Sequence, residues 1–145
     1  MDENLELLEY IYKNAEMGSY SLTKLIECLN GKENKIKKVV EDEIKGYEKY
    51  LEDSKKLIEK HDYDLKENGL MAKMGVSMGI KKETMVDNSD AAIAHMIIEG
   101  LTMGVVDISS KINNYKDDAD KKILNLAKSF LKFQEDEIER LKSFL

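Results

Sequence analysis

A stripe of side chains at helical spacing between residues 36 and 54 constrains this fold most, because one member of the stripe is a carboxylate. At about 100° per residue, one face of a helix would carry Ile36, Val40, Glu43, Tyr47, Tyr50 and Ser54. Glu43 lies within this stripe and not at its margin. A glutamate that faces a core needs a cation, a metal or a hydrogen-bond network, or it must hold its proton, because an unpaired buried charge is prohibitively costly. The stripe therefore predicts a core-packed helix and a polar site inside the core.

Composition extends the helical prediction to the whole chain. The 145 residues include no proline, no tryptophan and eight glycines, and 36% of them are charged. This composition favours long helices over a turn-rich β fold, and the length fits a single domain over residues 1–145 with one core. The net charge of −6 argues against a nucleic-acid partner, because there is no excess of basic side chains to neutralise phosphates.

Apolar periodicity predicts four long helices. They cover residues 3–29, residues 34–61, residues 89–115 and residues 119–145. Short connections join the first pair and the last pair, and a crossover at residues 62–86 joins the two pairs. The sequence thus predicts an all-α fold, an antiparallel four-helix bundle with a long connection that contains methionine and glycine.

The crossover carries methionines at helical spacing. Met71, Met74 and Met78 predict a short amphipathic segment laid over the bundle. A methionine stripe can bind a soft metal or an apolar partner, but packing is the commoner role, and packing is the prediction adopted for these three residues.

Sequence features bearing on cellular location favour the cytoplasm. Cys28 is the only cysteine, so one chain has no disulfide framework. The acidic N-terminus lacks the basic and apolar regions of a secretory signal. The most apolar stretch, residues 91–106, is shorter than a bilayer span and contains His95 and Glu99, so it predicts a buried helix and no membrane partner.

A short acidic sequence occurs twice. Residues 41–44 read Glu-Asp-Glu-Ile in the second predicted helix, and residues 135–138 repeat these four residues in the fourth. Two helix pairs that each end with this acidic turn resemble the duplicated halves of the ferritin-like superfamily, which includes ferritins, bacterioferritins and rubrerythrins. The resemblance covers nearly the whole chain at the level of architecture. It implies two metal ions held by one Glu from each of two helices and a Glu-x-x-His pair from each of the others.

Mapped by this resemblance, Glu16 and Glu99 are the single carboxylates, while Glu43 and Glu137 are the glutamates of the paired motifs. The implied metal is iron or manganese. The sequence departs from the family pattern three residues after each paired glutamate, where Gly46 and Arg140 replace histidine. Neither residue can act as a neutral imidazole ligand, which predicts a degenerate metal site.

Two other side chains leave alternatives open. His95 and Glu99 share a helical face, where they could bind one divalent ion with Glu43 or Glu137, or could form only a local hydrogen bond. Arg140, the only arginine, could neutralise the clustered carboxylates with bidentate bonds, or could be solvated near a helix C-terminus.

The leading functional prediction is a binding or interaction protein of unassigned role, with a degenerate metal site. One alternative is an oxidoreductase that activates dioxygen or peroxide on iron or manganese held by Glu16, Glu43, His95, Glu99 and Glu137. The other is an oligomeric scaffold protein, for which self-association through the methionine-rich crossover is expected. No phosphate-binding glycine loop is present in the sequence, and no residue is assigned a catalytic role.

Overall fold

The computed structural model describes residues 2–65 and 68–145, and the regular structure of these residues is entirely helical. The helices are α1 (Glu3–Cys28), α2 (Lys37–Lys60), α3 (Leu70–Val86), α4 (Asp90–Tyr115) and α5 (Lys121–Lys142). The all-α prediction is confirmed. The four long predicted helices correspond to α1, α2, α4 and α5, with ends that differ by a few residues because flanking turns replace the last helical residues.

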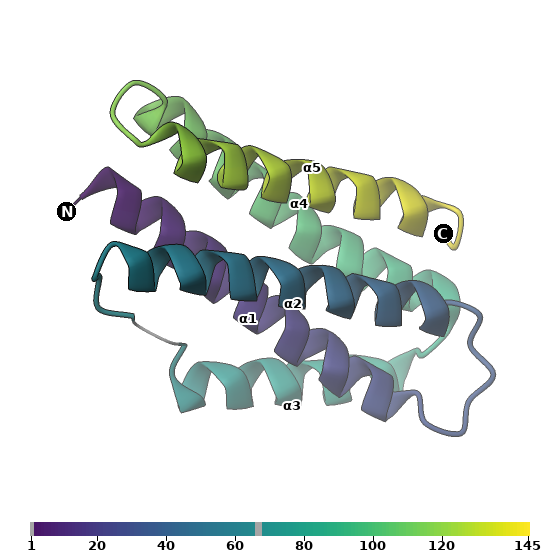
Figure 1. The fold of residues 1–145 in the computed structure, drawn as a ribbon. Coiled ribbons are helices and arrows are strands. Elements are labelled where there is room, and N and C mark those ends of the chain that lie inside the picture. The colour runs from purple at the N-terminus through teal and green to yellow at the C-terminus, as the bar shows by residue number, and fades with distance from the viewer. Residues whose placement is uncertain (1, 66–67) are drawn as a thin grey trace.

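Successive helices run in opposite directions along the molecule (Figure 1). Helices α1 and α2 form one antiparallel pair, and α4 and α5 form the other. The pairs meet where α5 packs against both α1 and α2 and where α4 packs against α1. The core therefore lies among α1, α2, α4 and α5. Helix α3 connects the two pairs along the chain and lies against α1.

Helix α3 occupies most of the crossover that the sequence predicted to be a connection with only a short helical segment. It is 17 residues long, so the described residues contain five helices and not four. Gly75 and Gly79 led to this error, because glycine in a helix costs about 1 kcal/mol relative to alanine. Both glycines are exposed, and the buried Ile80 and Thr84 hold the opposite face of α3.

The three methionines of the crossover do not pack on the bundle as predicted. Met71 is 86% exposed, Met74 53% and Met78 68%. Their spacing correctly indicated that they share a helical face, but spacing alone does not indicate which face of a helix meets the core. Packing of Val76 and Ile80 turns the methionine face of α3 towards solvent.

The stripe on α2 is buried over its whole length, as predicted, from Ile36 to Ser54. Two glycines make room for its aromatic neighbours. A Cβ at Gly46 would overlap the ring of Phe133, and a Cβ at Gly18 would lie 2.7 Å from the ring of Tyr47. These close approaches hold α2 against α5 and α1, and they place Glu43 inside the bundle.

Among the described helices, α4 is long and apolar enough to span a membrane by length and composition alone. The core helix of a soluble protein passes the same test. About 33% of its most apolar 18-residue window is buried, and the outward face carries Met103 and Val106.

Candidate functional site

Two buried glutamates face the interior from α2 and α5. Glu43 is 1% exposed and Glu137 is 6% exposed, although neighbouring acidic residues of the repeated sequence, such as Glu41 and Glu135, face solvent. Glu43 Oε1 and Glu137 Oε2 are buried and have no hydrogen-bond partner within residues 2–65 and 68–145. The helical period thus selects one carboxylate from each acidic repeat and buries it, as the periodicity predicted for Glu43.

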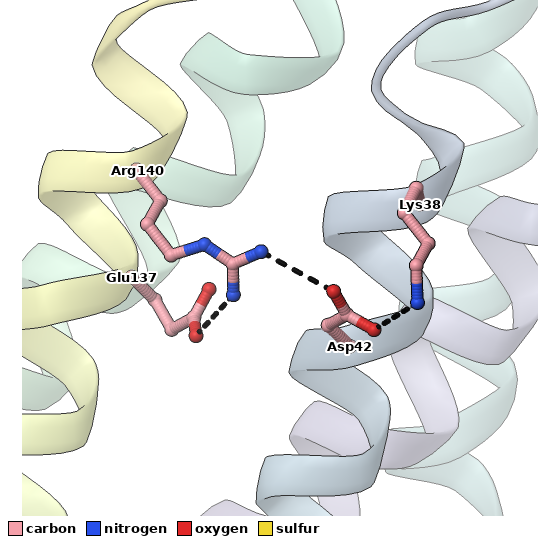
Figure 2. A network of polar contacts seen from close by, with 4 residues as sticks. All are labelled: Lys38, Asp42, Glu137 and Arg140. Carbon is pink, nitrogen blue, oxygen red and sulfur yellow. Dashed lines mark hydrogen bonds and ion pairs between the residues drawn. The ribbon is translucent and has the colours of Figure 1, made fainter.

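The two buried glutamates, Glu43 and Glu137, form an acidic centre. Arg140 lies at its edge and pairs with Glu137 and Asp42 (Figure 2). Its Nη1 donates to Glu137 Oε1 at 3.2 Å, and its Nη2 donates to Asp42 Oδ2 at 3.3 Å. Lys38 donates to the other Asp42 oxygen at 2.7 Å. The Arg140 side chain is 43% exposed, so it lies at the edge of the core and joins α5 to α2. Of the two alternatives for Arg140, the structure has the pairing with carboxylates.

The two buried glutamates differ in their electrostatic surroundings. Burial, and after it the nearby charge of Glu137, raise the pKa of Glu43 from 4.5 to about 8, and Arg140 only partly opposes the shift. Burial also raises the pKa of Glu137, but the charge and hydrogen bond of Arg140 counteract that effect. At neutral pH, Glu43 therefore holds its proton in most molecules, which is one of the states open to a core-facing glutamate.

A set of neutral polar groups lies beside the acidic centre. The amide of Gln134 donates to Asn14 Oδ1 at 3.4 Å, and Asn14 donates to the Tyr10 hydroxyl at 3.0 Å. Gln134 also hydrogen-bonds Tyr47 and packs where a Cβ of Gly104 would be. Burial raises the pKa of Tyr10 to about 12. Tyr10, Asn14 and Gln134 were missed from the sequence because each, taken alone, has an ordinary place in an amphipathic helix.

A cavity of about 510 Å³ opens between α1, α3 and α4. Its inner end includes the buried side chains of Glu43 and Tyr47 on α2, and it reaches the exposed residues Gly100 and Asp107 on α4. Its wall is mostly apolar, and the contributing side chains include Met17, Leu22, Leu25, Ile80, Met96 and Leu101. The cavity has the size and character of a small-molecule site, with a few polar groups in an apolar wall.

The other residues predicted as metal ligands lie away from the two glutamates. Glu16 accepts hydrogen bonds from the backbone and side-chain nitrogens of Asn68, at 3.1 and 3.0 Å, and lies 3.6 Å from Lys73. It thereby holds the start of α3 against α1. His95 and Glu99 form a 2.9 Å pair on the outside of α4, where both side chains are more than two-thirds exposed.

The predicted five-residue ligand set is therefore not assembled. Of these five residues, only Glu43 and Glu137 lie together in the acidic centre. Among residues 2–65 and 68–145 no group of three His, Cys, Asp or Glu side chains is placed to hold a metal ion. Where the ferritin-like pattern has histidine, Gly46 accommodates the ring of Phe133 and Arg140 supplies a fixed positive charge.

Comparisons with protein-family models, curated proteins and solved structures find no match to this chain. The acidic centre and the cavity are therefore the features of this chain that bear on its function.

Proposed function

We propose that this chain is a small-molecule binding protein built on a ferritin-like four-helix bundle, and that its binding site is the cavity between α1, α3 and α4. One observation carries the proposal: the buried carboxyl of Glu43 lines this cavity, and one of its oxygens has no hydrogen-bond partner among the described residues. A buried polar atom left without a partner costs free energy, and a bound ligand would supply that partner.

The ferritin-like part of the proposal is supported by the helix arrangement and the acidic repeat. Helices α1, α2, α4 and α5 form two antiparallel pairs, and α3 carries the chain back along the bundle, so that α4 runs in the same direction as α2 (Figure 1). Each second helix of a pair contributes one buried glutamate, Glu43 or Glu137. In this proposal Arg140 takes over the electrostatic role that metal has in that superfamily, because its guanidinium pairs with Glu137 and Asp42.

A neutral fluorescent probe, N-phenyl-1-naphthylamine, tests the binding site. We expect saturable binding of one probe per chain to the wild type and strong loss in Gly100→Leu. The Cβ at this position meets no atom within 4 Å, so leucine can enter the cavity mouth without disturbing the helix. Met78→Glu, which changes the exposed face of α3, is the matched control and should bind normally. Binding that survives Gly100→Leu but disappears in Met78→Glu would contradict the proposal.

Anaerobic loading with Fe(II) or Mn(II) tests the role of Arg140. The proposal expects no pair of tightly retained ions after desalting, whereas two retained ions per chain would favour the oxidoreductase alternative. Arg140→His restores the family spacing after Glu137 and serves as the comparison. Greater metal retention by this variant than by the wild type would agree with the proposed substitution of guanidinium for metal.

A second candidate function, an oligomeric scaffold, is favoured by the apolar outer surface. Exposed apolar side chains occur on both α3 and α4, and they comprise Leu70, Met71, Met74, Met78, Met85, Val86, Met103 and Val106. Light scattering of the wild type and of Met78→Glu tests this candidate. A stable oligomer that dissociates in the variant would support it, and a monomeric wild type would exclude self-association through this face at the concentration used.

A further inference from the structure

We infer that the cavity selects an apolar amine, whose ammonium group pairs with the carboxylate of Glu43 at the inner end while its apolar body lies against α1, α3 and α4. This inference rests on the proposed binding function and adds the chemical class of the ligand. It follows from three properties of the cavity: the unpaired acid at its inner end, the polarisable groups in its wall and the charges around it.

The inner end offers a hydrogen-bond acceptor to which no group in the described part of the chain donates. Glu43 Oε1 is buried without a partner, and the side chain is 1% exposed. An ammonium group carries three donors and no acceptor, so it can satisfy this oxygen and others near it. Hydrogen bonds in which both partners are charged are shorter and stronger than neutral ones.

The wall suits a cation with an apolar body. The rings of Tyr10 and Tyr47 and the thioethers of Met17 and Met96 line the cavity. Aromatic faces attract ammonium groups, and methionine fills irregular apolar space with a flexible, polarisable side chain. Apolar surface elsewhere in the wall would cover the remainder of the ligand.

Charge distinguishes an amine from an acid as the ligand. Glu43 interacts electrostatically with Tyr47 on its own helix and with Glu137 and Arg140 on α5. The cavity wall adds Tyr10 and Lys13 on α1 and Asp107 on α4. Arg140 is already paired with Glu137 and Asp42, and Lys13 is the one basic side chain that residues 2–65 and 68–145 contribute to the cavity wall. A ligand carboxylate would meet Glu43 and Asp107, whereas an ammonium group would neutralise the acid.

Binding of the amine transfers one proton from Glu43. In the free protein Glu43 is mostly protonated at neutral pH, and the bound state pairs a carboxylate with an ammonium, so the carboxyl proton is released to solvent or to the neutral form of the amine. Near pH 7 about one molecule in ten has the ionised acid when its pKa is about 8. Affinity for an amine should therefore rise about tenfold between pH 7 and pH 9, since an alkylammonium like that of lysine stays charged over this range.

Tryptamine, its alcohol analogue tryptophol and the acid indole-3-acetate provide matched probes. The chain contains no tryptophan, so indole fluorescence excited beyond the tyrosine band reports the ligand alone. We expect tryptamine to bind more tightly than tryptophol and indole-3-acetate to bind least. Glu43→Gln should weaken tryptamine binding by about tenfold to a hundredfold, the range for loss of a charged hydrogen bond, and should leave tryptophol binding nearly unchanged.

Glu41→Gln is the matched control, because Glu41 is an exposed glutamate two residues from Glu43 on the same helix, and it should bind all three probes as the wild type does. Urea unfolding of each variant confirms that the folded state is being compared. Equal binding of tryptamine and tryptophol, or unchanged tryptamine binding in Glu43→Gln, would overturn the amine inference while leaving a small-molecule site in place. Absence of saturable binding by every indole and by N-phenyl-1-naphthylamine would overturn the amine inference and the proposed function together.

Discussion

Replacement of Glu43 by glutamine should stabilise the fold at neutral and alkaline pH and have little effect near pH 4. The unfolded chain releases the Glu43 proton near pH 4.5, whereas the folded protein retains it up to about pH 8. Because the folded state binds the proton more tightly, the wild type loses stability as pH rises between these two values. Glutamine has nearly the same size and shape and carries no titratable proton, so the variant does not lose this contribution.

The magnitude follows from the difference between the two pKa values, 4.5 and about 8. Each unit of difference corresponds to about 1.4 kcal/mol. The stability gap between variant and wild type should grow by about 3 kcal/mol between pH 4 and pH 7, and should approach 5 kcal/mol above pH 8. Glu43 is almost fully buried, so solvent screens little of this effect.

Urea unfolding followed by circular dichroism at several pH values provides the assay. A gap of about 3 kcal/mol shifts the urea midpoint by roughly 1 to 3 M for a domain of this size. The difference between variant and wild type cancels the titration of the many exposed carboxylates. Glu41→Gln, which removes an exposed acid from the same helix, should show a gap near zero at every pH.

Two results would contradict a raised pKa of Glu43 in the folded protein. A gap between Glu43→Gln and the wild type that does not change with pH would mean that Glu43 titrates alike in the folded and unfolded states. A variant less stable than the wild type at pH 7 would mean that the ionised carboxylate is favourably paired in the folded protein, which conflicts with its unpartnered oxygen.

Three further predictions concern the supporting contacts. Arg140→Gln should lower the free energy of unfolding at pH 7 by about 1 to 2 kcal/mol, because it leaves the buried Glu137 without its cation. Urea unfolding measures this change, and unchanged stability would mean that the ion pair does not stabilise the fold. Gly46→Ala should lower the free energy of unfolding by about 1 to 3 kcal/mol, because the added Cβ would overlap the ring of Phe133. Gly100→Ala should raise it by up to about 1 kcal/mol, because its Cβ meets open space. Similar shifts of the melting temperature in the two variants would contradict this packing. Glu16→Ala, which removes the acceptor oxygen, should speed amide hydrogen exchange in α3 more than in α1, because the Glu16 oxygen holds the start of that helix. Exchange that rises equally in both helices would argue against this role.

Helical periodicity predicted the main features of the fold and one half of the site. The spacing from Ile36 to Ser54 placed Glu43 in the core, because a helix buries whichever residues share its packed face. The repeated acidic sequence identified Glu137 as its counterpart on α5. These inferences needed only one helix at a time, and the structure agrees with both.

Features that depend on two or more helices could not be read from spacing. Glu16 and Glu99 have suitable positions on their own helices, but α3 pairs with Glu16, and α4 is rotated so that Glu99 faces solvent. The methionine face of α3 was assigned to the core for the same reason. The cavity is formed by side chains from four helices, so no local pattern in the sequence indicates it.

The proposed site depends on an acid that stays protonated until a cation enters, so the ionisation of Glu43 is the decisive measurement. Its side-chain carboxyl can be followed by ¹³C NMR as pH is raised, with Glu43→Gln used to assign the resonance. We expect a midpoint of about 8 in the free protein and a lower midpoint when tryptamine is saturating. A midpoint close to 4.5 in the free protein, or one that tryptamine does not lower, would contradict the proposed site.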